Sequence, residues 1–332
     1  MSSKSDISIP LMPGCAYHVF NRGNDKNTIF FKEENYVYFL KRYQDYTKGY
    51  LDTYAYCLLE NHFHFCFKVK SVKQILTTAL ADKNFKLNKA FMRQYVSPYL
   101  QSISDKGELH NIPARHELDK LVIQELLDET SEYYTNQIAH RALAHHVLLK
   151  SDTEDLSAHE VEIHPNKLET VSFTLQLCSY LVSQRIQRFF LSYAKSINKQ
   201  QKRTGSLFQK CYRRKFLATD EDIRGTISYI HHNVIHHQYG SSYKEYEWTS
   251  YHEYLSREKD SITCTEAILL YGDTKEFIRI SEEYRKNHPL SFLTEEKQQN
   301  LQRRKDQYAI SSNNNLVKEK RSIVNGKRIE TP

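Results

Sequence analysis

Two histidines separated by one aromatic residue, His62 and His64, are the side chains whose types and spacing first suggest chemistry. They lie in Asn61-His62-Phe63-His64-Phe65, a segment that alternates polar and apolar residues as a half-buried β-strand does. Successive strand side chains point to opposite faces, so both imidazoles should share one face and the two phenylalanines the other. The spacing predicts a two-point metal clamp; two ordinary surface histidines are the alternative reading.

A catalytic metal site needs a third ligand and an open position for substrate. The predicted helix 220–237 offers Tyr229 and Asn233, which are four residues apart and therefore share a helical face. An asparagine oxygen beside two imidazoles would suit Mg²⁺ or Mn²⁺ with a bound phosphate. The Tyr229 phenol would then be a nucleophile toward phosphorus, once a metal or a base helps to activate it. A half-buried core tyrosine is the alternative. The neighbouring His231, His232, His236 and His237 are interpreted as phosphate contacts or bystanders, with assistance in proton transfer as the alternative.

The positive charge of the chain is concentrated in one stretch. The formal net charge is +7, yet the residues between Glu169 and Asp220 include ten basic and no acidic side chains. Such a stretch indicates a polyanionic partner, and nucleic acid is the commonest one, whereas a solvated lysine-rich face usually has interspersed acids. Arg213, Arg214 and Lys215 are expected to contact backbone phosphate; a charged sheet edge that blocks aggregation is the alternative. The residues predicted to bind DNA are Arg22, Lys199, Lys202, Arg203, Lys210, Arg213, Arg214 and Lys215.

Periodicity predicts the elements that must position these residues. A two-residue turn at Glu60-Asn61 should join two strands into a hairpin, and Thr219 should cap the tyrosine helix, because three acidic residues follow it. The expected strands cover 14–22, 51–59, 61–69 and 207–217, and the expected helices cover 33–48, 72–82, 170–200 and 220–237.

The middle of the chain differs in composition. Between His116 and Glu162 there are eleven acidic residues against three basic ones. Helical character from Gln124 to Leu149 and a polar loop from Ser151 to His164 suggest an acidic, mainly helical insertion over 84–165. This insertion would split a domain formed by 10–83 and 166–255. Residues 256–332 would form a polar C-terminal extension, partly disordered beyond Leu290.

Cysteine usage and hydropathy limit the class of protein. The six cysteines are scattered and form no C-x-x-C pattern, which argues against zinc ribbons and disulfide frameworks. No apolar run is long enough to span a membrane, and the first residues lack the apolar core of a signal peptide. A cytoplasmic protein without a membrane partner is therefore expected.

Five segments, in chain order, resemble the motifs of one family. They are Tyr17-His18-Val19-Phe20-Asn21-Arg22-Gly23, Asn61-His62-Phe63-His64-Phe65, Gly205-Ser206-Leu207-Phe208-Gln209, Tyr229-Ile230-His231-His232-Asn233 and Trp248-Thr249-Ser250-Tyr251. Together they resemble the HUH single-tyrosine transposases, and most closely the REP-associated tyrosine transposases. The chain departs from that pattern in the insertion, in the C-terminal extension and in Val234, where the family often has proline.

The resemblance implies a ferredoxin-like α+β fold, an antiparallel sheet with helices packed on one side. It also implies that His62, His64 and Asn233 hold the metal. Tyr229 would cleave single-stranded, hairpin-bearing DNA, keep the 5′ phosphate and release a 3′ hydroxyl, in a monomer or a homodimer. Two alternatives remain open: a replication-initiator or relaxase-type nickase of the HUH superfamily, and a domesticated transposase that binds DNA hairpins without cleaving them.

Overall fold

The sheet is the centre of the molecule. The computed structural model describes residues 7–82, 87, 91, 123, 124, 126, 139, 165–240, 242–256, 262, 263 and 265–287. Within them lies an α+β fold with four strands in the order β2-β3-β1-β4, and every neighbouring pair of strands is antiparallel. The strands are β1 (Ala16–Arg22), β2 (Leu51–Leu59), β3 (His62–Val69) and β4 (Arg213–Leu217).

The predicted β2–β3 hairpin is confirmed. Its strands are joined by a turn at Glu60 and Asn61, and Leu59 lies opposite His62. The predicted strand over 207–217 is wrong in its first half, since β4 begins only at Arg213. Residues 207–209 lie outside β4 and pair with the chain at the end of β1. The Asn24 amide donates to the Leu207 carbonyl, and the Gln209 amide donates to the Arg22 carbonyl.

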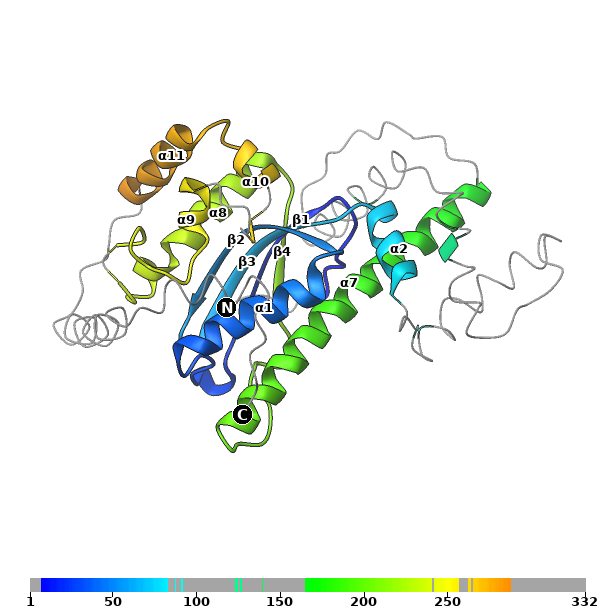
Figure 1. Cartoon of the computed structure of the whole chain (residues 1–332). Helices are drawn as coiled ribbons and strands as arrows, with labels where there is room; N and C mark the ends of the chain where they lie inside the picture. Colours follow the sequence, from blue (N-terminus) through cyan, green and yellow to red (C-terminus); the bar gives the residue numbers. More distant parts are fainter. Residues whose placement is uncertain are drawn as a thin grey trace, which may run out of the picture.

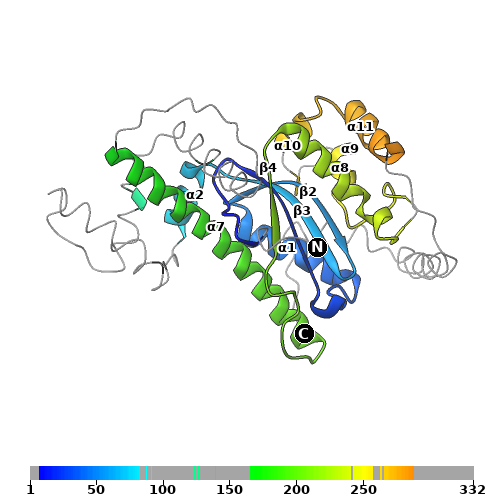
Figure 2. The ribbon, with the colours of Figure 1, turned by 180° about the vertical axis from the view of Figure 1, so that it is seen from behind.

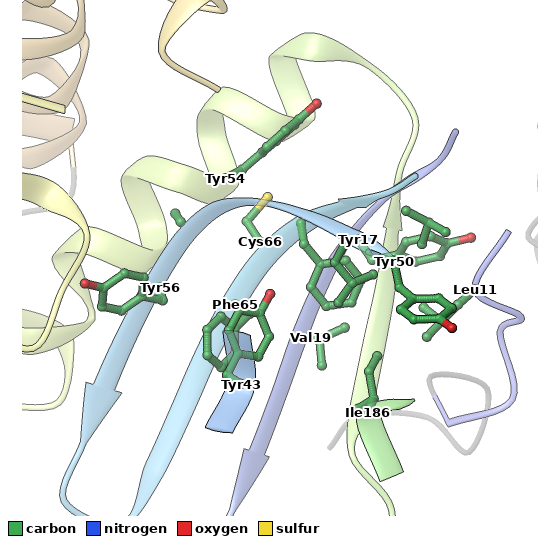
Figure 3. Close-up of a cluster of buried hydrophobic side chains, with 14 of the residues drawn as sticks. Leu11, Tyr17, Val19, Tyr43, Tyr50, Tyr54, Tyr56, Phe65, Cys66 and Ile186 are labelled. Atoms are coloured by element: carbon green, nitrogen blue, oxygen red, sulfur yellow. The ribbon is translucent and has the colours of Figure 1, made fainter. Parts of the chain in front are cut away.

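One layer of helices covers the phenylalanine face of the sheet. It contains α1 (Glu33–Thr47), α2 (Val72–Ala81) and α7 (Pro165–Gln200), and both views show α1 and α7 side by side (Figures 1 and 2). The core beneath them is aromatic. Tyr43 of α1 stacks on Phe65 of β3 with ring centroids 4.3 Å apart, and Cys66 points to the opposite face (Figure 3). This alternation confirms the predicted two-faced strand.

A second layer covers the histidine face. It contains α8 (Asp220–His236), α9 (Tyr251–Leu255), α10 (Thr265–Leu269) and α11 (Thr274–Asn287) (Figure 1). The predicted cap of α8 is confirmed, because the Thr219 hydroxyl accepts from the Asp222 amide at 3.1 Å. The expectation of helices on one side only is wrong. The apolar side chains Ile227, Ile230 and Val234 are buried and give α8 a face that packs on β2 and β3.

The C-terminal extension is structured over part of its length. Helices α10 and α11 fall within it, and Phe277 of α11 packs against Tyr254 with ring centroids 4.4 Å apart and against His231 of α8 at 5.8 Å. The predicted polar tail beyond Leu290 lies outside the described residues. So do the predicted loop over 151–164 and nearly all of the predicted helix over 124–149.

None of the described helices is both long enough and apolar enough to cross a bilayer.

Candidate metal and tyrosine site

A cavity of about 340 Å³ opens between the histidine face of the sheet and the C-terminal end of α8. Its size is at the lower end of the range of small-ligand sites, about 300–1,000 Å³. Among the described residues, no acidic side chain lines it, so its walls favour an anion. The lining residues are Phe20, Asn21, Arg22, His62, His64, Gln209, Arg213, Tyr229 and His237.

The orientation of the His62 ring follows from its neighbour. The Asn61 side-chain nitrogen donates to the Lys26 carbonyl at 3.0 Å, which leaves the Asn61 oxygen as the acceptor facing His62 Nδ1 at 2.7 Å. Nδ1 must therefore carry the proton, and Nε2 has the lone pair. Among the described residues, the buried Nε2 of His62 has no hydrogen-bond partner. An unsatisfied buried nitrogen costs about 1–3 kcal/mol, unless a ligand such as a metal ion binds it.

His64 lies two residues along the same strand. Its Nδ1 is 2.9 Å from Nε2 of His18 on β1, so its own Nε2 is the atom left for a ligand. Phe20 stacks on the His64 ring with centroids 5.4 Å apart. Both features fix the plane of the imidazole before any ligand arrives.

A third histidine completes the cluster. His237 directly follows α8, and its ring centroid is 4.4 Å from that of His62. The candidate ligand atoms of His62, His64 and His237 all lie within 4.8 Å of one another, so this group can bind a metal ion. Sequence reasoning assigned His237 to phosphate contact or to no role. Its position, one helical turn beyond Asn233, was the signal that could have identified it.

Burial keeps these imidazoles in the neutral form that metals bind. It lowers the pKa of His62 to about 3, with the nearby His237 and Arg22 adding to the effect. Burial likewise lowers the pKa of His64 well below its usual value, whereas His237 is exposed and its pKa is lowered by partial desolvation together with the nearby Arg22 and His236. At neutral pH a metal ion would therefore meet three free lone pairs and displace no protons.

Asn233, the predicted third ligand, is fully buried in α8. Its side-chain nitrogen donates to the Tyr229 carbonyl at 3.1 Å, and among the described residues its oxygen has no partner. It is not among the residues that line the cavity. The role of Asn233 as a metal ligand stays a prediction. The structure offers His237 as a second candidate for the third ligand.

Tyr229 projects from α8 over the histidines. Its half-buried ring lies edge-on to His18 and His64, with centroids 5.7 and 5.8 Å away. Burial raises the pKa of its phenol, and the neighbouring Cys57 adds to that increase. The tyrosine and the three histidines thus meet within one chain, in a pocket where the phenol is protonated at neutral pH.

The basic residues predicted to bind DNA do not all share this face. Arg22 and Arg213 line the cavity, and Lys215 lies opposite His18 in the sheet, on the same face. Arg214 points to the other face, where it donates to the Ile7 carbonyl at 2.8 Å. The backbone of residues 207–209, in the loop that follows α7, hydrogen-bonds the end of β1 at Arg22. The remaining predicted residues lie at the end of α7 and in this loop: Lys199, Lys202, Arg203 and Lys210.

Searches against protein-family models, curated proteins and solved structures gave no match to the chain.

Proposed function

We propose that the chain is a metal-dependent DNA transposase that cleaves and rejoins single-stranded, hairpin-bearing DNA through a 5′-phosphotyrosine on Tyr229. The observation that carries the proposal is the meeting of Tyr229 with His62, His64 and His237 in one cavity with basic walls. The five motifs that resemble the single-tyrosine transposases support it as well. Four of them supply residues of this cavity: the motifs at β1, β3 and α8, and the segment 205–209 through Gln209.

The cleavage step exchanges one phosphodiester for another. The Tyr229 oxygen attacks phosphorus, the bond from phosphorus to the 3′ oxygen breaks, and that oxygen leaves as a 3′ hydroxyl after gaining a proton. The phenol proton passes to water. Rejoining reverses the step with a different 3′ hydroxyl, so no outside energy source is needed. Arg22 and Arg213 would bind the non-bridging oxygens and orient the phosphate.

The donor set suits a divalent metal ion. The orphaned Nε2 of His62 and the free Nε2 of His64 would supply two ligands, and His237 or Asn233 the third. When bound, Mg²⁺ or Mn²⁺ would polarise a phosphoryl oxygen and offset the charge that develops on it. A site with three imidazoles favours Mn²⁺ over Mg²⁺, because nitrogen ligands bind the transition metal more tightly.

We further propose that the fold is ferredoxin-like. The strand order β2-β3-β1-β4, the helix α1 between β1 and β2, and α2 and α7 between β3 and β4 support this assignment. The DNA would run from the cavity past Arg22 to the exposed basic residues that follow α7. Since one chain supplies the nucleophile and the histidines, a monomer would suffice, although a homodimer fits equally. The compartment we propose is the cytoplasm.

A second candidate is a domesticated transposase that binds DNA hairpins without turnover. The raised pKa of the Tyr229 phenol favours it, because a protonated phenol is a weak nucleophile. A relaxase-type or replication-initiator nickase is the third candidate. The motif Tyr229-Ile230-His231-His232-Asn233 argues against it, because this motif resembles that of the transposases.

An adduct assay separates these functions. Labelled single-stranded hairpin DNA is incubated with the protein and Mn²⁺, and covalent complexes are resolved on a denaturing gel. We expect an adduct that is lost with Tyr229→Phe and with EDTA. His62→Ala should abolish the adduct yet retain most DNA binding, since phosphate contacts dominate affinity. Tight binding without an adduct under any metal would support the non-catalytic candidate, and an adduct on Tyr229→Phe would refute the assigned nucleophile.

A further inference from the structure

His18 belongs to no ligand set described above, yet it is buried against the metal cluster. It lies in the middle of β1, opposite Cys66 of β3 and Lys215 of β4, and its side chain is 8% exposed. Its Nε2 is 2.9 Å from Nδ1 of His64, and the two ring planes differ by 24° with centroids 5.2 Å apart, as in two imidazoles that lie edge to edge. Two neutral imidazoles joined in this way must divide the roles of donor and acceptor.

Metal binding by His64 determines which of the two rings donates the hydrogen bond. A metal ion on Nε2 of His64 needs the lone pair of that nitrogen, so Nδ1 of His64 must carry the proton. That proton then points at Nε2 of His18, which has to accept it. His62 has a parallel arrangement, with the Asn61 oxygen in the accepting role.

We propose that His18 is a positioning residue that accepts the Nδ1–H of His64 and thereby fixes the tautomer and plane in which His64 binds the metal ion. The inference rests on the metal site of the proposed function. It explains why a histidine of β1 is buried beside the cluster without entering the cavity, whose lining residues include Phe20 and Arg22 from that strand. Loss of a residue that hydrogen-bonds a metal-binding histidine typically weakens metal affinity about 10- to 100-fold.

Two substitutions at the same position test the acceptor directly. His18→Gln places an amide oxygen about where Nε2 lies, whereas His18→Asn has the same amide one carbon shorter and cannot reach His64. Mn²⁺ binding to the full chain is measured by titration calorimetry without DNA. We expect His18→Asn to weaken Mn²⁺ binding about 10- to 100-fold and His18→Gln to stay within about threefold of the parent.

His231→Asn controls for the general cost of altering a buried histidine. Its Nε2 bonds the Ser250 hydroxyl at 2.9 Å on the α9 side of α8, so it should lower thermal stability and leave Mn²⁺ affinity unchanged. In the Zn²⁺-loaded parent, long-range proton–nitrogen NMR correlations should show His64 protonated at Nδ1.

Equal Mn²⁺ affinities of His18→Asn and the parent would overturn the proposal, as would equal losses in the Gln and Asn variants. A His64 protonated at Nε2 in the Zn²⁺ complex would overturn it too. Failure of the proposed function looks different. A parent chain that binds Mn²⁺ with the expected pattern of variants, but forms no DNA adduct, would leave the role of His18 intact and remove the transposase activity.

Discussion

The identity of the third metal ligand gives the sharpest quantitative prediction. His237 lies with His62 and His64 in a group whose ligand atoms are within 4.8 Å of one another, whereas the Asn233 amide donates to the Tyr229 carbonyl. Structural zinc sites with four ligands bind Zn²⁺ with an apparent free energy of about 10–16 kcal/mol, or about 3 kcal/mol per ligand. At 1.4 kcal/mol per tenfold change, loss of one ligand weakens binding about 100-fold. We therefore expect His237→Ala to raise the Kd for Zn²⁺ about 100-fold.

The assay is competition for Zn²⁺ against a fluorescent chelator at pH 7.5, with His236→Ala as the matched control. His236 is exposed, adjacent in sequence and outside the metal-competent group, so its loss should leave Kd unchanged. Asn233→Ala should cost about 1 kcal/mol of stability from its lost hydrogen bond, with Kd changed by only a few fold. A 100-fold loss in Asn233→Ala together with an unaffected His237→Ala would refute this reasoning and restore the amide as the ligand.

Three further predictions concern stability and DNA binding. Burial holds the pKa of His231 well below the usual 6.5, so only the unfolded chain gains this proton. His231 should therefore add about 1.4 kcal/mol per pH unit to the fall in the free energy of unfolding below pH 6.5, beside the contributions of the other histidines whose pKa is lowered. In urea titrations across pH, His231→Gln should reduce the slope by about that amount while keeping the bond to Ser250, and an unchanged slope would contradict the assignment. Arg213→Ala should weaken single-stranded DNA binding and reduce its salt slope by about 0.7, as seen by fluorescence anisotropy at several salt concentrations. Arg214→Ala should do neither, because that guanidinium donates to a carbonyl on the other face. Finally, Phe277→Ala should cost about 3–5 kcal/mol in chemical denaturation, since the ring is buried between α8 and α9; a loss under 1 kcal/mol would show that α11 packs weakly.

Local pattern was enough to predict the elements that build the site. The alternation around His62 and His64 and the acidic turn after Thr219 are short-range signals, and both strand β3 and the cap of α8 follow them. The error at 207–212 has a local cause too. An extended run of apolar and basic residues reads as one strand, but its antiparallel pairing with β1 stops at Arg213 and is resumed only in a shifted register, with Phe208 opposite Gly23.

The composition of the cluster could not be predicted in the same way. His237 and His62 are 175 positions apart, and only the docking of α8 on β2 and β3 brings them together. His18 is hidden for a similar reason, since its contact with His64 depends on the pairing register of β1 with β3. Helix α11 was missed because a polar composition hides the few buried residues, Phe277 among them, that attach it to the fold.

Peptide mass spectrometry shows whether Tyr229 becomes covalently joined to DNA, the step on which the proposed function depends. The protein is incubated with Mn²⁺ and single-stranded hairpin DNA, then digested with nuclease and trypsin, and the peptide 225–244 is fragmented. We expect a nucleotide 5′-phosphate on Tyr229 and on neither Tyr239 nor Tyr243 of that peptide, with a free 3′ hydroxyl on the released strand. A nucleotide on another residue, or a cleaved strand that ends in a 3′ phosphate, would contradict it.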